Sequence, residues 1–409
     1  MKRHYIIALL VLGFASCAPQ KEQKTNQAVT SIASPAGDLS ATPYLFTDTS
    51  NKTYLSWTEK TDSANLFKFS VLESGSWSKP KLITSGNTWF INWADYPMIA
   101  GQGNGNLIAH ILNKSGESTY AYDVKMFSST DNGEQWNHSF VLHDDGKQAE
   151  HGFVSLLPYG ENIFVAWLDG RNTVMEGMEN MAGHDGHHAR LPDGQGAMSL
   201  RAAIIDYQGN KINEWELDNK TCDCCQTAAA ITDNGPVVVY RDRSDEEIRD
   251  MSIVRWVDGE WTQPQTIYAD NWKIAGCPVN GPRISANGNN LAVAWFGLVD
   301  NEAQVKVIFS NDGGASFGTP VRIDEGQPIG RVDIEMTDNG KAMVSWMEGT
   351  KIKAVKVSAD GTKGEPIDIA TSSEARSSGF PQMAKNGNDF IFAWTDDGDK
   401  KVKTASVKL

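Results

Sequence analysis

The chain lacks several features that would place it in common structural classes. The apolar run near the N-terminus, residues 6–14, is too short to span a bilayer. No amphipathic helix of useful length is evident from the periodicity of apolar residues. Acidic residues outnumber basic ones by 51 to 37, and the net charge of −14 argues against a nucleic-acid partner, because binding phosphates needs a basic face. By contrast, 13 Trp and 37 Gly suit many short strands joined by tight turns.

One short sequence pattern recurs along the whole chain. An apolar, strand-like run ends in a large side chain at Trp57, His110, Trp167, Tyr240, Trp295, Trp346 and Trp394. A repeat of about 50 residues built from strands predicts a radial array of small sheets. We therefore expect an all-β fold, a β-propeller of four-stranded antiparallel blades. Seven blades are favoured, and six remain open if the terminal pieces form one composite blade.

The two ends of the chain complement each other. The last repeat ends at Leu409 after three predicted strands, and AVTSIAS at 28–34 precedes the first repeat and has a strand-like pattern. We expect this segment to supply the missing outer strand and close the ring, because closure protects the sheet edges. The propeller would then occupy residues 36–409 as one domain.

The N-terminus, MKRHYIIALLVLGFASC, has the order of a cleaved export signal: positive charge, apolar run, then small residues. Placement of Cys17 at the cleavage point resembles the bacterial lipobox, in which that Cys is acylated. A plain secretory signal is the alternative. We expect a signal peptide at 1–16, a lipid anchor with a flexible tether at 17–35, and an exported lipoprotein of the bacterial cell envelope, at the outer membrane.

Two predicted turns between third and fourth strands share the pattern S-x-D-x-G-x-x-aromatic. Their defining residues are Ser129, Asp131, Gly133 and Trp136, and Ser310, Asp312, Gly314 and Phe317. In such a turn the Asp accepts backbone N–H bonds, the Gly takes a positive φ, and the aromatic packs between strands. Both turns resemble the Asp-box, or bacterial neuraminidase repeat, of the sialidase-like β-propellers.

This resemblance implies a binding site at one end of the propeller axis for an acidic, glycan-type ligand. A sialidase of the family also has an arginine triad, a Tyr nucleophile with a Glu partner, and an Asp acid/base. The first Arg of that triad lies in an R-I-P motif, where this chain reads ATPYLF. Exo-α-sialidase chemistry and glycan binding without turnover are therefore both open.

Polar residues gather where the first strands of the blades begin, which is where a propeller has its axial pocket. Arg283, Arg331 and Arg376 are expected to hold a carboxylate or sulfate, because bidentate Arg geometry suits both. If the protein hydrolyses glycosides, Asp95 is the acid/base candidate and Tyr240 the nucleophile candidate. The alternative for each is a solvated loop residue or a turn cap. Other members of this group are Asn92, Trp93, Glu150, His151, Asn280 and Asp333.

Four cysteines remain after Cys17, namely Cys222, Cys224 and Cys225 in a CDCC run and Cys277 in the next repeat. Two disulfides would need one bond within CDCC, which is strained for adjacent residues. One disulfide to Cys277 with two free thiols is open. The other interpretation is a thiolate site for copper or zinc, because soft thiolates select Cu(I) or Zn(II).

The third repeat contains an insertion in which possible metal ligands recur every third residue. They are Met175, Met178, Met181, His184 and His187, with His188 adjacent and Met198 beyond. Thioether and imidazole groups at this spacing suit copper in an oxidising compartment, and a Gly-rich surface loop is the alternative. Three functions follow: a sialidase-like hydrolase or glycan binder, which the fold resemblance favours, a copper-binding lipoprotein, and a non-catalytic protein-binding scaffold.

Overall fold

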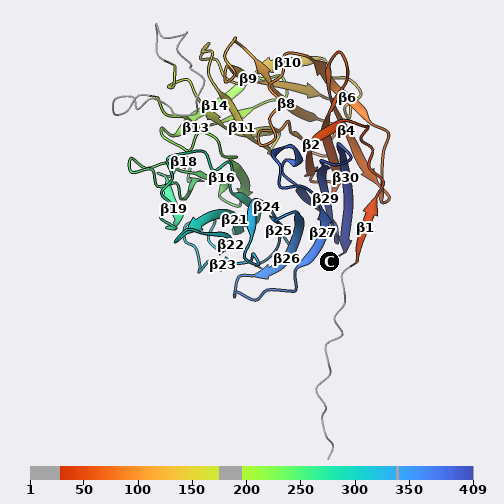
Figure 1. Cartoon of the computed structure of the whole chain (residues 1–409). Helices are drawn as coiled ribbons and strands as arrows, with labels where there is room; N and C mark the ends of the chain where they lie inside the picture. The colour runs from red at the N-terminus through yellow and green to blue at the C-terminus, as the bar shows by residue number, and fades with distance from the viewer. Residues whose placement is uncertain (1–27, 175–195, 338–339, 409) are drawn as a thin grey trace, which may run out of the picture.

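The chain forms a ring of seven small antiparallel sheets, and Figure 1 shows them following one another in chain order around the ring. The structure is a computed structural model that describes residues 28–174, 196–337 and 340–408. First strands of neighbouring blades contact one another around the ring, so they are the innermost strands. The seven-bladed propeller predicted from the repeat is confirmed.

The first four blades contain the strands that follow, with an extra short strand in blades 1 and 4. Blade 1 has β2 (Ser40–Thr47), β3 (Thr53–Lys60), β4 (Asn65–Glu73), β5 (Ser76–Trp77) and β6 (Lys81–Gly86). Blade 2 has β7 (Ile99–Gly101), β8 (Leu107–Lys114), β9 (Tyr122–Ser129) and β10 (His138–Val141). Blade 3 has β11 (His151–Tyr159), β12 (Asn162–Asp169), β13 (Ser199–Ile205) and β14 (Lys211–Asp218). Blade 4 has β15 (Ala228–Thr232), β16 (Gly235–Arg241), β17 (Met251–Val257), β18 (Glu260–Trp261) and β19 (Gln265–Tyr268).

The remaining three blades complete the ring. Blade 5 has β20 (Arg283–Asn287), β21 (Asn290–Val299), β22 (Glu302–Ser310) and β23 (Val321–Arg322). Blade 6 has β24 (Pro328–Met336), β25 (Lys341–Glu348), β26 (Lys351–Ser358) and β27 (Ile367–Thr371). Blade 7 has β28 (Gln382–Asn386), β29 (Asp389–Asp396), β30 (Lys401–Lys408) and β1 (Val29–Ile32).

Blade 7 is built from both ends of the chain. Its outermost strand, β1, pairs antiparallel with β30, with Val29 opposite Val407 and Ile32 opposite Thr404. Figure 1 shows the red β1 beside the blue β30. The expected closure by the segment at 28–34 is therefore confirmed.

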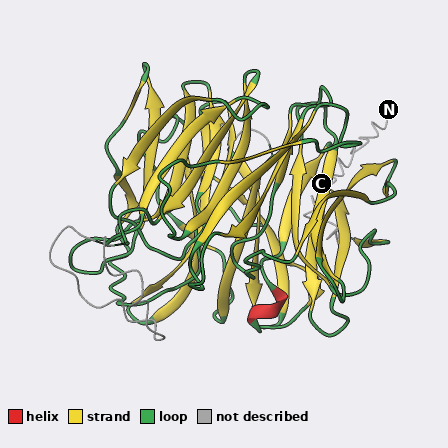
Figure 2. Ribbon diagram, turned by 90° about the horizontal axis from the view of Figure 1, so that it is seen from above, coloured by secondary structure: helices red, strands yellow, loops and turns green. Residues whose placement is uncertain are grey.

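Strands and loops make up almost all of the described structure (Figure 2). A 3-10 turn, η1 (Arg376–Ser378), leads into β28. Among the described residues, no helix has the length and apolar character needed to cross a membrane.

The two Ser-Asp-Gly turns lie between third and fourth strands, as expected from their spacing. After β9, the Ser129 hydroxyl donates to Asp131 Oδ1 at 2.7 Å and accepts from the Gly133 amide at 3.0 Å. After β22, Ser310 makes the same two bonds with Asp312 and Gly314, at 2.7 and 2.9 Å. Trp136 and Phe317 pack against the hydrophobic clusters of their blades.

The large aromatic residues that end the second strands lie in the hydrophobic clusters, and several have their polar atom bound to a carboxylate. The Nε1 atoms of Trp57, Trp167 and Trp346 each donate to the acidic residue two positions later, at 2.7 to 2.8 Å. In blade 2 the equivalent residue is His110, which is fully buried, and both of its ring nitrogens lack hydrogen-bond partners among the described residues. Burial therefore lowers the pKa of His110 from 6.5 to about 3.

His110 makes the folded state sensitive to acid. Because the unfolded chain protonates this ring below pH 6.5 and the folded chain does so only near pH 3, stability is full above pH 6.5 and falls as the pH drops from 6.5 to 3. The loss attributable to this group is about 1.4 kcal/mol per pH unit. Replacing His110 with Leu should remove that part of the slope in urea denaturation followed from pH 7 to 4.

His138→Leu is the matched control, because His138 is exposed on β10. We expect its slope to match that of the wild type. An unchanged slope in His110→Leu would show that His110 is not the buried neutral group described here.

Candidate functional site

The entrances to the first strands meet at one end of the propeller, where a single buried side chain joins three of them. Gln226, which follows the CDCC run, donates to the Ala94 carbonyl at 2.7 Å and accepts from the Gly281 amide at 2.8 Å. Ala94 precedes the first strand of blade 2, and Gly281 precedes that of blade 5. The CDCC segment is thereby fixed against two other blades.

All four cysteines of the described residues are unbonded thiols, and the structure brings them together. The Sγ atoms of Cys222, Cys224 and Cys225 lie within 4.8 Å of one another, with Cys222 at 3.3 Å from Cys225 and 4.0 Å from Cys224. Cys277, from the connection between β19 and β20, lies close enough to Cys224 for the two thiols to affect each other's ionisation. We call Cys222, Cys224 and Cys225 the thiol trio.

Positive charge lies directly beside the thiol trio. Arg249, in the connection between β16 and β17, donates from Nη1 to Cys222 Sγ at 3.2 Å. Burial opposes ionisation of Cys222, but its thiol neighbours and the charges of Arg249 and Arg241 outweigh burial and hold its pKa well below the ordinary value. Burial raises the pKa of Cys225. Cys222 is thus the thiol of the trio that ionises first.

Arg241 positions the segment that carries Cys277. Its guanidinium is 2% exposed and donates to the carbonyl oxygens of Arg249, Asn280 and Phe296 at 2.6 to 3.1 Å. It therefore joins both sides of the cysteine group. Arg249 and Gln226 were not among the residues singled out from the sequence, although Gln226 directly follows the CDCC run.

Arg243 braces the same region through ion pairs. It pairs with Asp223 at 3.1 Å and with Glu247 at 2.8 Å, and Glu247 in turn accepts from Arg249 at 2.9 Å. The acidic member of the CDCC run is therefore part of an ion-pair network around the thiols.

Met198, which follows the methionine and histidine insertion in the sequence, contacts the segment that leads into the cysteines. Its carbonyl oxygen accepts two hydrogen bonds from Thr221, the residue before Cys222. The insertion's other predicted ligands lie outside the described residues: Met175, Met178, Met181, His184, His187 and His188.

The three predicted axial arginines do not form a clamp around one point. Arg331 donates to the carbonyl oxygens of Glu374, Ala375 and Gly379 and to the hydroxyl of Ser378, so its guanidinium is occupied by the segment around η1. Arg376 is exposed, and both guanidinium groups lie over the ring of Trp93, at 5.1 and 5.9 Å.

Arg283 lies on the inner strand of blade 5, near a different aromatic ring. Its guanidinium is 5.7 Å from the ring of Tyr96, and its Nε is 3.9 Å from Asp333. Its Nη2 atom is buried and has no hydrogen-bond partner within the described part of the chain. Arg283 therefore keeps an unused, buried donor on the inner strand of blade 5.

The two predicted catalytic residues, Asp95 and Tyr240, bind different partners. The hydroxyl of Tyr240 is buried and donates to Asp218. It therefore has a partner in the protein interior and does not face solvent. Asp95 accepts from the Phe153 amide at 2.9 Å, and its Oδ2 has no partner among the described residues. Burial raises the pKa of Asp95 to about 7.

A Tyr–Glu pair that was not predicted, Tyr122 and Glu150, lies near Asp95. Tyr122, at the start of β9, donates to Glu150 Oε1 at 2.7 Å, and burial raises the pKa of Glu150 to about 8. No sequence pattern selects Tyr122, because it starts a third strand rather than a first. Tyr122 and Asp95 are only 1% and 3% exposed, so the group is closed to a saccharide in this conformation.

His151 belongs to a charged network at the base of the insertion. Its Nδ1 faces the carbonyl oxygens of Tyr122 and Ala149 at 3.2 Å, and its Nε2 faces Asp145 at 3.0 Å. Its hydrogen-bond partners are all acceptors, and the ring of His143 stacks on it at 3.5 Å. Burial lowers the pKa of His151, but Asp145 and Asp169 outweigh burial and raise it overall. The contacts of His151 with Asp145 and Asp169 join the segment before β11 to the end of β12.

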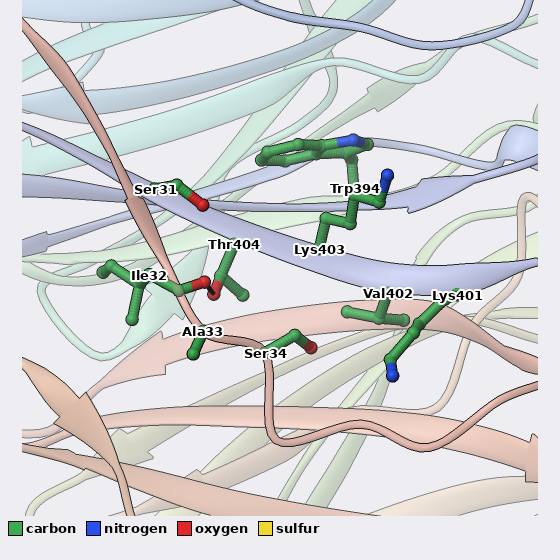
Figure 3. Close-up of a pocket in the computed structure, with 9 residues that line it drawn as sticks. All are labelled: Ser31, Ile32, Ala33, Ser34, Trp394, Lys401, Val402, Lys403 and Thr404. Carbon is green, nitrogen blue, oxygen red and sulfur yellow. Dashed lines mark hydrogen bonds between the residues drawn. The ribbon is translucent and has the colours of Figure 1, made fainter. Parts of the chain in front are cut away.

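A separate groove lies at the ring closure, on the outer strands of blade 7 (Figure 3). Because β1 and β30 supply most of its walls, it is peripheral to the first-strand entrances. The residues that line it are Ser31, Ile32, Ala33, Ser34, Trp394, Lys401, Val402, Lys403 and Thr404.

Comparisons with known proteins identify the fold. No protein-family model matches the chain, and no curated protein matches it in sequence. A protein of unknown function from Dyadobacter fermentans DSM 18053 is similar over 95% of this chain and 99% of its own, with 12% identity and a TM-score of 0.50. The polysaccharide lyase Uly1 is similar over 96% of this chain and 94% of its own, with 9% identity and a TM-score of 0.50.

A Hadza microbial sialidase, Hz136, is also similar, over 85% of this chain and 74% of its own, with 13% identity and a TM-score of 0.49. Similar structures thus include a sialidase and a polysaccharide lyase. At such low identities the likeness to the Dyadobacter protein and Uly1 shows a shared propeller fold and transfers no residue role.

The contact between Gly281 and Gln226 leaves no room for a side chain. A Cβ on Gly281 would lie 2.1 Å from the Gln226 carbonyl oxygen and 2.7 Å from its amide nitrogen. Gly281→Ala should therefore displace the CDCC segment and lower the free energy of unfolding by about 1–3 kcal/mol. Urea denaturation of the full chain measures this change.

Gly276→Ala is the matched control in the same connection, because a Cβ there has its nearest neighbour at 3.9 Å. We expect that variant to differ from the wild type by less than about 0.5 kcal/mol. Equal stabilities for both variants would show that the packing of Gly281 against Gln226 does not hold the segment.

Proposed function

We propose that this protein binds a thiophilic metal ion, Cu(I), through the thiol trio at the axial end of the propeller. The observation that carries the proposal is the convergence of three buried or half-buried Sγ atoms within 4.8 Å of one another, with a fourth thiol adjoining. Cysteine thiolates are the ligands that Cu(I) and Zn(II) prefer in proteins.

The sulfur spacing supports metal ligation. Four sulfurs at about 2.3 Å from a tetrahedral zinc ion would lie about 3.8 Å from one another. The observed separations of 3.3 and 4.0 Å bracket that value. A compact set of three sulfurs favours Cu(I), because structural zinc takes four ligands in nearly all sites.

Local charge supports the same conclusion. Three thiolates around one Cu(I) carry two net negative charges, which need compensation in a buried setting. Arg249 donates directly to Cys222, and Arg241 lies beside it with its guanidinium fixed by carbonyl oxygens. The site thus provides both soft ligands and fixed positive charge.

Metal binding should depend on each member of the trio. Protein purified without oxygen should bind one Cu(I) per chain, and Cys222→Ser and Cys225→Ser should each weaken binding at least 100-fold in competition with a chromophoric chelator. Gly276→Ala serves as the control and should bind as the wild type does. Circular dichroism separates lost binding from lost folding.

Two results would overturn this proposal. One is native protein whose four cysteines are all in disulfides and which binds neither copper nor zinc. The other is a pair of serine variants that bind Cu(I) as tightly as the wild type. Binding of Zn(II) in preference to Cu(I) would contradict the choice of metal.

The second candidate function is the binding of an acidic saccharide at the same end of the propeller. The specific observation is Trp93, a half-buried ring that stacks on Phe380 at 5.5 Å and lies beside the exposed Arg376. An aromatic face with a neighbouring guanidinium suits a sugar ring bearing a carboxylate or sulfate. The fold likeness to Uly1, a polysaccharide lyase, is consistent with it.

Because Tyr240 and the Tyr122–Glu150 pair are buried, we expect saccharide binding without hydrolysis. On a glycan array, acidic oligosaccharides should bind in preference to neutral ones, and Trp93→Ala should reduce binding at least 10-fold. Tyr268→Ala, which removes an exposed aromatic ring on β19, is the control. Turnover of a fluorogenic sialoside, or equal binding by both variants, would contradict this candidate.

Export and lipid attachment through Cys17 complete the proposal and stay predictions, because residues 1–27 lie outside the described part of the chain. Lipid attachment would hold the propeller at the surface of a membrane of the bacterial cell envelope, where it would meet metal ions carried by other envelope proteins.

A further inference from the structure

We propose that Cys277 is the exchange ligand of the metal site, through which Cu(I) arrives from and leaves to a thiol-bearing metal carrier. This inference rests on the proposed function and adds the route and the class of partner. It assigns the fourth cysteine a kinetic role that differs from the binding role of the thiol trio.

A gradient of exposure runs across the four thiols. Cys222 and Cys225 are 1% and 2% exposed, Cys224 is half-buried, and Cys277 is exposed. The most exposed thiol, Cys277, therefore lies beside the most accessible member of the trio, Cys224. An incoming thiol can therefore approach the metal from the side of Cys277, whereas Cys222 and Cys225 are shielded by protein.

The segment that carries Cys277 is an arch fixed at both ends. At one end the Ile274 amide donates to the Glu247 carbonyl at 2.9 Å, and at the other Arg241 donates to the Asn280 carbonyl at 2.8 and 3.1 Å. Between these anchors, a Cβ placed on Gly276 would meet a single atom within 4 Å, a side-chain carbon of Ile274 at 3.9 Å. The open space at Gly276 shows loose packing of the arch next to Cys277, which is the property that movement of Cys277 toward or away from the metal would need.

The trio itself has no such freedom. The backbone amide of Cys222 donates to the Arg241 carbonyl at 3.0 Å. Gln226, the residue after Cys225, binds two other blades through its side chain. A rigid buried set of ligands beside one ligand on a loose arch is the arrangement that ligand exchange requires.

The exchange step balances without any redox change. A thiolate of the carrier leaves Cu(I) as Cys277 Sγ bonds to it, and the trio then displaces the remaining carrier thiolates. Copper stays Cu(I) throughout. Each thiol that becomes a ligand releases a proton to solvent, and each carrier thiolate set free takes one up.

The test measures rate and affinity separately on the full chain, with Cu(I) bound to glutathione as the donor. Cys277→Ser should load at least 10-fold more slowly than the wild type and should return Cu(I) to excess glutathione more slowly by a similar factor. Its equilibrium affinity should change less than 3-fold, because the same path serves both directions. Gly276→Ala, on the same arch, should load at the wild-type rate.

The alternatives give different results. If Cys277 were a permanent fourth ligand, Cys277→Ser would lose affinity as Cys225→Ser does, and the inference would fail while the proposed function stood. An unchanged loading rate in Cys277→Ser would also overturn it. A wild-type chain that binds no Cu(I) would instead refute the proposed function.

Discussion

Pairing of β1 with β30 is the constraint on which the rest of the structure depends. It joins the two ends of the described chain in one blade and closes a ring whose inner strands contact one another on every side. An open array would expose the edge of β30 and would let the first-strand entrances spread apart. The cysteine site exists because closure holds the entrances of blades 2, 4 and 5 at distances that one side chain, Gln226, can bridge.

The repeating core and the axial site are stabilised by different kinds of contact. In the core, large side chains at the ends of second strands fill the spaces between blades, and acidic residues accept their polar hydrogens, as Glu59 does for Trp57. At the axial end the blades differ from one another, and buried polar groups are satisfied by contacts between blades. Arg241 and Arg331 illustrate this, because each guanidinium donates to backbone carbonyl oxygens of a neighbouring connection.

Much of the fold was predictable from the sequence, because strand pairing within a blade is local and leaves a periodic pattern. Spacing favoured seven blades over six and predicted the closure by residues 28–34 and the positions of the two Asp-containing turns. It did not predict the partners of individual site residues. Gln226 binds Ala94, which lies 132 positions away in the sequence. The hydrogen bond from Tyr240 to Asp218 depends on how β14 and β16 lie in space. The run of cysteines indicated the cysteine group by residue type alone. The carbonyl oxygens that bind Arg331 could not be predicted, because a backbone acceptor has no signature in the sequence.

X-ray absorption at the copper edge of the metal-loaded full chain tests the central claim most directly. A buried trio of thiolates predicts a first shell of sulfur alone, three atoms at about 2.3 Å, with the edge position of Cu(I). A first shell containing nitrogen or oxygen would contradict the account, because it would place the metal at histidine or carboxylate groups and away from Cys222, Cys224 and Cys225.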